Sequence, residues 1–404
     1  MRALKSILHV GISLLIGFVL VLLSIQVLSS VDSAASTPLM ENIKTGKSTE
    51  ATSFTGVTEW YTGTVSTIAR GNSSIVIDSS GYPRISYEAD GIWQNLRYAQ
   101  WTGSEWVKTT VDSVDFGTAT SLALDDSENP HISYAVCNPY SCPAKYAEWT
   151  GSSWLVTENM DGFGSLAIDT NGNSHISYKY GNVVGMTSLK YAYREAGIWI
   201  STTVDLDPIS NRSISLKLDG SDHPHISYYK EDTLKYAYWN GSEWIMQVVD
   251  SAYAISPGQK TSMALDGSDA PHIVYYDGES QDLKYAAWDG IKWLIETVDS
   301  VGDVGKYASL VLDSNGYPHI IYYDAENQAI KYAYRMGTGW QTNIVEIGVG
   351  DGNETSLAIG PDDRLHLTYS YYGGPTDRAL RYAYGDVIFY DHSVYLPLVT
   401  VADQ

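Results

Sequence analysis

The sequence predicts an all-β fold, a seven-bladed β-propeller of four-stranded blades, on three observations. Variants of the stretch 310–323 recur seven times between residues 74 and 370. One position of this repeat recurs at spacings of 47, 44, 50, 47, 47 and 47 residues. Within each repeat, apolar and polar residues alternate with the period of a β-strand. A period of about 40 to 50 residues built from short strands is typical of propeller blades.

Each repeat contains four strand signals in a fixed order. An apolar run that begins with Ser, such as 309–312, reaches a turn rich in Asp, Asn, Gly and Pro, and an alternating run such as 225–229 follows in the same pattern. Two such runs around a turn predict a β-hairpin. A third run such as 234–238 is joined to a fourth, which starts at Trp244, by a turn containing Asn240-Gly241. That pair accepts the positive φ of tight hairpin turns.

The ring is expected to close through both ends of the repeat region. The seventh repeat has its third-strand Tyr382 but runs into Gly385 without reaching a Trp strand. The segment 58–65 has the pattern of that missing strand, and its Trp60 lies 46 residues before Trp106. We therefore expect the first strand of the domain to complete the last blade, which leaves no open sheet edge.

Four segments are predicted along the chain. Residues 1–35 begin with Arg2 and Lys5, continue through an uncharged stretch at 6–31 and end in small residues, which indicates either a cleaved secretory signal peptide or a retained membrane anchor. Residues 36–56 are expected to be a flexible linker, and 57–386 the propeller. The tail 387–404 breaks the repeat. Its 393–399 stretch resembles a C-terminal tail of exported bacterial proteins, which implies sorting or envelope attachment; a strand packed on the ring is the alternative.

Charge and cysteine content agree with an extracellular or cell-surface location. The formal net charge is −22, and so acidic a surface repels phosphate backbones, which excludes nucleic acid as a partner. Membrane contact is expected only through the N-terminal segment, and the protein is expected to be a monomer. Cys137 and Cys142 predict a local disulfide bond in an exported protein, since a metal site would need two further ligands.

Recurring polar residues have a structural and a functional interpretation. The repeat position whose spacings are given in the first paragraph is the start of the second strand. It holds Arg84, His131, His175, His225, His272, His319 and His366, and Asp recurs at the preceding turn in six repeats. A catalytic group is needed once, so we expect these residues to be structural, and no metal site or catalytic residue is predicted. No cofactor is expected, although calcium at the turns 219–222 and 266–269 stays open.

Function is expected where the repeats differ. Cations precede the first strand in four repeats, and one has a tyrosine beside it; these candidate ligand-binding residues are Arg70, Arg212, Lys260, Lys306 and Tyr307. If they point inward, they form a basic channel mouth that binds an anion such as a carboxylated sugar; solvated loop charges are the alternative. Paired Trp residues, such as Trp288 and Trp293, fit either sugar binding or cross-strand packing.

Residues 58–386 resemble the exported bacterial seven-bladed propellers, a grouping that includes sialidase-like repeat proteins, propeller lectins and some polysaccharide lyases. The resemblance implies the fold alone. The sialidase turn motif is Ser-x-Asp-x-Gly-x-x-Trp, whereas the turn here at 313–319 has no Trp and lies one strand earlier, so no catalytic residue carries over.

The sequence thus favours an exported or surface-anchored binding module, rather than an enzyme, for glycans or another extracellular polymer. The first alternative is a polysaccharide lyase or glycosidase at the basic mouth, with His and Tyr as acid and base. The second is a structural envelope protein without a ligand.

Overall fold

The computed structural model describes residues 56–57, 59–89, 95–113, 117–136, 144–160, 164–181, 187–206, 209–251, 260–337, 339–350, 354–374 and 377–388. Within these residues all regular structure is β: seven sheets have four antiparallel strands each, and an eighth has two. No helix in this part of the chain is long and apolar enough to cross a membrane. The segments 1–35 and 36–55, the two cysteines and the tail from 389 onward lie outside the described residues, so the predictions made for them stay predictions.

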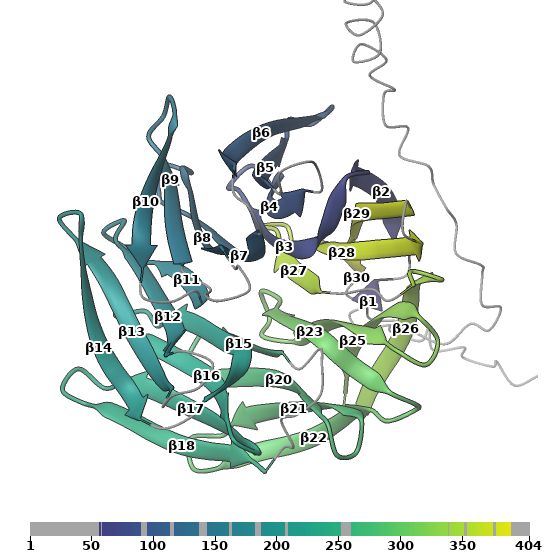
Figure 1. The fold of residues 1–404 in the computed structure, drawn as a ribbon. Helices are drawn as coiled ribbons and strands as arrows, with labels where there is room; N and C mark the ends of the chain where they lie inside the picture. Colours follow the sequence, from purple (N-terminus) through teal and green to yellow (C-terminus); the bar gives the residue numbers. More distant parts are fainter. Residues whose placement is uncertain are drawn as a thin grey trace, which may run out of the picture. The chain divides into compact units, whose positions relative to one another are not determined.

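Each four-stranded sheet is one blade (Figure 1). The first strands are β3 (Ala69–Ile77), β7 (Gly117–Leu124), β11 (Gly164–Ile168), β15 (Ile209–Leu218), β19 (Thr261–Leu265), β23 (Val304–Leu312) and β27 (Thr355–Ile359). The second strands are β4 (Pro83–Ala89), β8 (Pro130–Val136), β12 (Ser174–Tyr180), β16 (Pro224–Lys230), β20 (Pro271–Asp277), β24 (Pro318–Asp324) and β28 (Leu365–Gly374). The third strands are β5 (Asn95–Trp101), β9 (Ala144–Trp149), β13 (Ser188–Glu195), β17 (Thr233–Trp239), β21 (Asp282–Trp288), β25 (Ala329–Met336) and β29 (Asp377–Gly385). The fourth strands are β6 (Trp106–Ser113), β10 (Trp154–Met160), β14 (Ile198–Leu206), β18 (Trp244–Asp250), β22 (Trp293–Asp299), β26 (Gly339–Ile347) and, for the seventh blade, β2 (Tyr61–Ser66).

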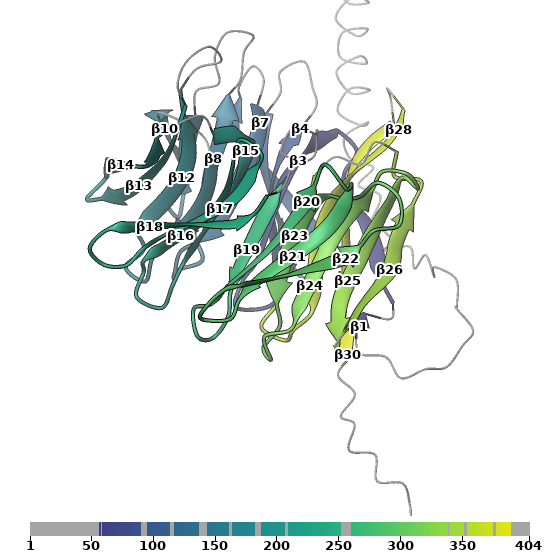
Figure 2. The ribbon, with the colours of Figure 1, turned by 90° about the horizontal axis from the view of Figure 1, so that it is seen from below.

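The predicted closure is confirmed. The seventh sheet has the order β2-β29-β28-β27, so the first long strand of the domain is the outer strand of the last blade. Its register pairs Tyr61 with Tyr384 and Ser66 with Leu380. The strand starts at Tyr61, three residues later than the sequence pattern indicates, and Trp60 directly precedes it. A second link between the ends is the pair β1 (Gly56–Val57) and β30 (Val387–Ile388), which takes up the first residues of the predicted tail (Figure 2).

Serine side chains join the first strands of neighbouring blades into a ring. In every blade a Ser Oγ accepts the backbone N–H of a residue in the next first strand, at 3.0–3.3 Å. The seven ring serines are Ser74, Ser121, Ser165, Ser215, Ser262, Ser309 and Ser356, and the bond from Ile75 N–H to Ser356 closes the circle. This recurrent bond explains why each apolar run begins with Ser.

The recurring Asp and His are structural. Asp313 Oδ1 accepts the N–H groups of Asn315 and Tyr317 at 2.9 Å, which closes the turn, and its Oδ2 lies 3.3 Å from His319 Nε2. The other ring nitrogen, Nδ1, lies 2.6 Å from the hydroxyl of Tyr332 on the third strand. Five blades contain this Asp–His pair; the first has Asp78 with Arg84 in its place, and the seventh has Gly360 where the Asp stands elsewhere.

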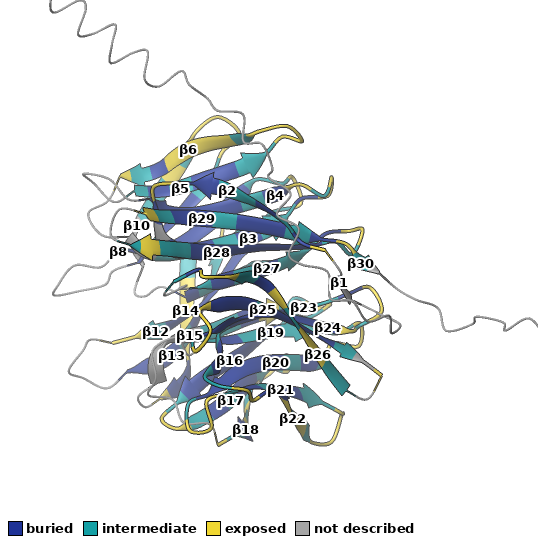
Figure 3. Cartoon of the chain, turned by 90° about the vertical axis from the view of Figure 1, so that its right-hand side faces the viewer, coloured by how far each residue is buried: buried dark blue, intermediate teal, exposed yellow. Residues whose placement is uncertain are grey.

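The same tyrosines pack against the fourth-strand Trp of the following blade. The ring centroids lie 5.0–5.4 Å apart in pairs of edge-to-face type, a favourable arrangement for aromatic rings. The pairs are Tyr98–Trp154, Tyr146–Trp199, Tyr191–Trp244, Tyr236–Trp293, Tyr285–Trp340, Tyr332–Trp60 and Tyr382–Trp106. Apolar clusters fill the same spaces between blades, so the core lies between the sheets (Figure 3).

Candidate functional site

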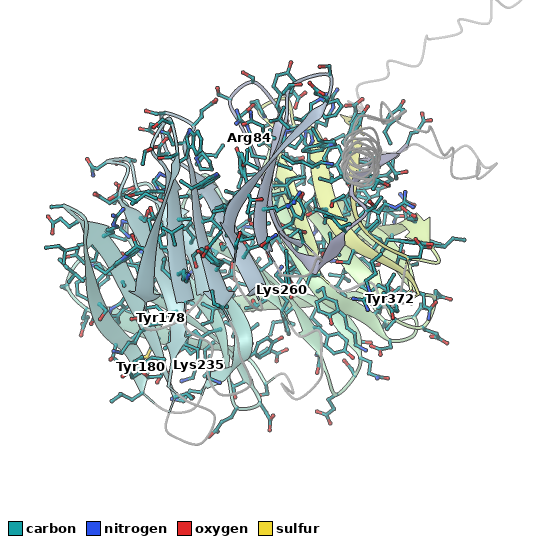
Figure 4. The ribbon with its side chains drawn as sticks, turned by 45° about the horizontal axis from the view of Figure 1, so that its top comes forward. Arg84, Tyr178, Tyr180, Lys235, Lys260 and Tyr372 are labelled. Atoms are coloured by element: carbon teal, nitrogen blue, oxygen red, sulfur yellow. The ribbon has the colours of Figure 1, made fainter. Side chains whose placement is uncertain are left out.

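The repeats differ most at one mouth of the channel. The position two residues before each ring serine holds Asn72, Ala119, Phe163, Ser213, Lys260, Tyr307 and Glu354, a different residue in every blade. Phe163 lies outside the described residues, as does the side chain of Ser213. First strands begin at the end of the blade where second strands finish, so these residues belong to one face of the ring. Figure 4 shows Lys260 near its centre.

Lys260, Tyr307 and Glu354 are linked through Thr355. The Lys260 Nζ donates to the backbone carbonyl of Thr355 at 3.2 Å, although the two residues belong to blades 5 and 7. The Thr355 hydroxyl donates to the carbonyl of Tyr307 at 2.5 Å. Glu354 precedes Thr355 and acts electrostatically on Lys260. These contacts bring the Lys260 ammonium and the backbones of Tyr307 and Glu354 together at one end of the ring. All three residues are half-buried, and the Tyr307 ring packs in part on the apolar cluster between blades 6 and 7.

Tyr307 and Glu354 both have left-handed backbone conformations. Their φ angles are 57° and 62°, a region that costs non-glycine residues about 1 kcal/mol or more. Around Tyr307 the pairing of β23 with β24 shifts register between Lys306 and Ser309. Strain of this kind in a bulky residue is concentrated at functional sites.

Burial lowers the pKa of Lys260, and the nearby Glu354 offsets part of that shift. The Lys260 side chain keeps part of its surface exposed. Its ammonium is nevertheless surrounded closely enough by protein to lose part of its hydration, and this loss lowers the pKa. Because its pKa is lowered, the ammonium gives up its proton more readily than an ordinary lysine does. A bound anion would stabilise its charged form.

The residues of the predicted basic mouth do not occupy one register. Lys260 lies two residues before its ring serine, whereas Lys306 lies three before its own. Lys306 Nζ forms an ion pair with Asp303 and lies 5.6 Å from the ring centroid of Tyr276, so its charge is already compensated. Arg70 is in β3 and Arg212 in β15, but their side chains lie outside the described part. Their role in the mouth therefore stays a prediction.

Thr355 joins the site although nothing in the sequence singles it out, and Glu354 stands out in the sequence only as a departure from the repeat at the start of the last blade. The signal was available: counting back from each Ser aligns Glu354 with Tyr307 and Lys260. If the repeats are instead aligned by their positive charges, Lys306 falls opposite Lys260. The bond from Lys260 to a carbonyl two blades away has no signal in the sequence.

Other candidates have structural roles in the described residues. Asp222 accepts hydrogen bonds from Thr170 N–H and Oγ1, and Asp269 accepts one from Gly220 N–H, so both candidate calcium turns brace a neighbouring blade. Within the described ranges no group of three His, Cys, Asp or Glu residues could hold a metal ion. In the Trp pairs the rings contact each other, as in Trp288–Trp293 at 5.4 Å. Packing accounts for these pairs.

No protein-family model matches the chain, and no curated protein matches its sequence. Solved structures share its fold. A ulvan lyase from a new family of polysaccharide lyases, bound to a unit of glucuronic acid and sulfated rhamnose, is 11% identical with a TM-score of 0.56, covering 79% of this chain and 94% of that chain. A protein of unknown function from Dyadobacter fermentans is 9% identical with a TM-score of 0.51, covering 80% and 96%.

The Aleuria aurantia lectin is also similar, with 16% identity, a TM-score of 0.48 and coverage of 70% of this chain and 97% of that chain. A score this low carries no argument about this chain. Identities of this size establish the shared fold and leave activity to the site itself. The chain is therefore a seven-bladed propeller that resembles polysaccharide lyases in fold.

Proposed function

We propose that the protein binds a glycan across the channel mouth, with Lys260 holding a carboxylate and Tyr307 offering its ring and hydroxyl to a sugar. The observation that carries the proposal is the contrast between the repeated ring of serines and the non-repeated Lys260, Tyr307 and Glu354 beside it. In a ring of similar blades, a single binding site can form only where the residues of the blades differ. The carbohydrate ligand of the ulvan lyase propeller agrees with this proposal.

The net charge narrows the class of glycan. A charge of −22 repels a polyanion over distances up to the Debye length, about 8 Å at physiological ionic strength. A polymer whose carboxylates are separated by neutral sugars presents one charge to Lys260 at a time. We therefore expect spaced uronates to bind better than densely charged chains.

β-Elimination at the same mouth is the second candidate. In that reaction a base removes the proton beside a uronate carboxylate, the glycosidic bond to the leaving sugar breaks, and a new double bond forms in the ring. Lys260 would neutralise the carboxylate, and Tyr307, starting as the phenolate, would take up that proton and return it to the oxygen of the leaving sugar. The observation favouring it is the lowered pKa of Lys260 beside a strained tyrosine. The six second-strand histidines are bonded to tyrosine hydroxyls within the blades and take no part.

Lys260→Met is expected to weaken binding of a uronate-containing polysaccharide about ten- to a hundredfold, because a charge-assisted hydrogen bond contributes about 1.5–3 kcal/mol. Isothermal titration against a panel of polysaccharides measures the change, and the appearance of unsaturated chain ends tests for elimination. Lys292→Met is the matched control, since Lys292 is an exposed lysine in the β21–β22 turn.

Equal weakening by both substitutions would indicate a general charge effect and contradict a site at the mouth. Weakening by Lys306→Met equal to that of Lys260→Met would instead support the broader basic mouth that the sequence predicts. Unsaturated ends that vanish in Lys260→Met would move the protein to the lyases.

We also propose that the protein is exported as a monomer to the cell surface or medium, with Cys137 and Cys142 joined. The support is the N-terminal sequence, with its cationic start and apolar run, and the acidic composition. The mass of the protein recovered from its native host distinguishes a cleaved signal from a retained anchor.

A further inference from the structure

A second contact between blades recurs around the ring and uses an acid six residues after the fourth-strand Trp. Asp205 of blade 3 accepts a hydrogen bond from the Tyr228 hydroxyl of blade 4 at 2.7 Å and another from Lys235 at 3.2 Å (Lys235 is labelled in Figure 4). Asp112, Asp250, Asp299 and Glu346 accept from the corresponding tyrosines in the same way. Each acid thus satisfies a buried hydroxyl, and in four of the five junctions it also pairs with a lysine.

The junction between blades 7 and 1 lacks that acid. The position six residues after Trp60 is Ser66, which pairs with Leu380 as Asp112 pairs with Leu96. The serine hydroxyl is too short and uncharged to replace a carboxylate. Blade 1 nevertheless keeps the tyrosine and the cation, as Tyr87 and Arg97, directly opposite each other on adjacent strands.

The polar groups left at this junction have no anion among the described residues. The Tyr87 side chain is 0% exposed, and its hydroxyl makes no hydrogen bond to any residue in the described ranges. The hydroxyl lies beside Ser66 and Arg97, which counteract the rise that burial causes in the pKa of Tyr87, but neither meets the geometry of a hydrogen bond. The buried Nε of Arg97 likewise has no hydrogen-bond partner in the part of the chain that the structure describes.

A further cation faces the same junction. Lys108 lies opposite Ala99 in β6, on the face of blade 1 that carries Arg97. The corresponding residues two positions after the other Trp residues are uncharged: Thr62, Val156, Ser201, Met246, Ile295 and Thr342. Burial and the neighbouring Arg97 lower the pKa of Lys108, as expected for two cations without an acid between them. β6 is largely exposed, so solvent reaches this lysine (Figure 3).

We propose that the junction of blades 7 and 1 is a binding site for the carboxylate group of a small organic acid or uronic acid, held by Arg97 and Lys108 with the Tyr87 hydroxyl as a third donor. The ligand takes the place that an Asp or Glu side chain has at five other junctions. Those acids define the chemistry: a planar carboxylate fits the forked donors of an arginine. This site is separate from the channel mouth and does not depend on it.

The junction of blades 2 and 3 supports the contrast. There the acid position is Met160, whose side chain lies outside the described set, and the lysine of the triad, Lys190, lies over the Tyr180 ring at 4.1 Å from its centroid. A lysine without its acid is thus given an aromatic partner at that junction. Among the residues that the structure describes, no aromatic ring lies under Arg97, and a second cation, Lys108, stands beside it.

Ser66→Asp is the decisive variant, because it supplies the missing carboxylate from the chain itself. In the full chain, glucuronate and acetate are each expected to raise the thermal midpoint of the wild type, with glucose and sodium chloride at equal ionic strength as controls. Made in a Lys260→Met chain, so that the channel mouth adds no response of its own, Ser66→Asp is expected to unfold at a higher midpoint without ligand and to lose the response to both acids. A stronger response to glucuronate than to acetate identifies a sugar acid as the ligand, and equal responses identify any small carboxylate.

Lys108→Met is a second test in case the Ser66→Asp chain fails to fold. The variant is expected to fold, since uncharged residues occupy this position in every other blade. It is expected to weaken glucuronate binding at least about tenfold in isothermal titration. The same loss is expected when Lys108→Met is made in a chain that already carries Lys260→Met, so failure of the channel mouth and failure of this site are told apart. A wild type that responds to neither acid, or a Ser66→Asp variant that responds fully, overturns the proposal.

Discussion

Replacing Trp60 with alanine is expected to lower the free energy of unfolding by about 3–5 kcal/mol, the usual cost of truncating a buried Trp. Trp60 is 4% exposed and packs edge-to-face on Tyr332 at 5.4 Å. It directly precedes β2, the strand that closes the ring, and lies in the cluster that joins blades 6 and 7. Loss of the indole removes the packing of the chain's first strand against the sixth blade, so closure of the ring weakens with it.

Urea unfolding followed by tryptophan fluorescence measures the loss. Trp101→Ala is the matched control, because Trp101 is only partly buried at a hairpin end and its described ring contact is Trp106 at 5.3 Å. The control is expected to lose about 0.5–1.5 kcal/mol, the range of one aromatic pair. Equal losses in the two variants would show that closure through Trp60 adds nothing beyond ordinary packing.

The architecture could be predicted because it is repeated. A strand pattern that is ambiguous once becomes decisive when it recurs at a fixed spacing, and Trp60 was identified as the seventh fourth-strand Trp by counting alone. The starting point of β2 could not be placed, because Thr58 and Glu59 continue the polar pattern of a strand. The residue that aligns the blades exactly is the ring serine, whose role depends on a hydrogen bond to another blade.

The candidate sites were predicted less well, for the opposite reason. Function lies where a blade departs from the repeat. Such a departure can be recognised only when the repeats are aligned residue by residue. Lys260 and Lys306 look equivalent by charge, yet one lies at the channel mouth and the other pairs with Asp303. Ser66 draws no attention in the sequence, since its importance comes from the acids that stand at the same position elsewhere.

Acidification from pH 6.5 to about 4 is expected to destabilise the propeller by about 3 kcal/mol through His366 alone. Burial, with a smaller effect of Arg364, lowers the pKa of His366 to about 4, whereas an unfolded histidine titrates near 6.5. Between these values the unfolded chain binds a proton that the folded chain does not, so stability falls as the pH falls. Burial also lowers the pKa values of His225 and His272, which adds loss in the same direction.

Urea unfolding at pH 7.5 and pH 4.5 measures this loss, and His366→Gln is expected to reduce its size. The aspartates at the turns have lowered pKa values, so the stability they contribute is lost only below about pH 4, the range of an unfolded carboxyl. If the His366→Gln variant loses as much stability between pH 7.5 and 4.5 as the wild type, groups other than His366 cause the loss.

At Gly360 no turn carboxylate opposes the effect of burial on the pKa of His366, and restoring the missing acid is expected to reverse part of the shift. In blade 4 the turn carboxylate of Asp219 raises the pKa of His225 against the effect of burial, but the seventh blade has Gly360 at this point. The buried Nε2 of His366 has no hydrogen-bond partner among the described residues. A Cβ on residue 360 would lie 3.6 Å from that nitrogen and 2.7 Å from Oδ1 of Asp362, an exposed side chain that can move. Gly360→Asp should therefore raise the pKa of His366 and flatten stability between pH 6.5 and 4.5. An unchanged slope would mean that burial, and not the absent carboxylate, sets the acid sensitivity of this blade.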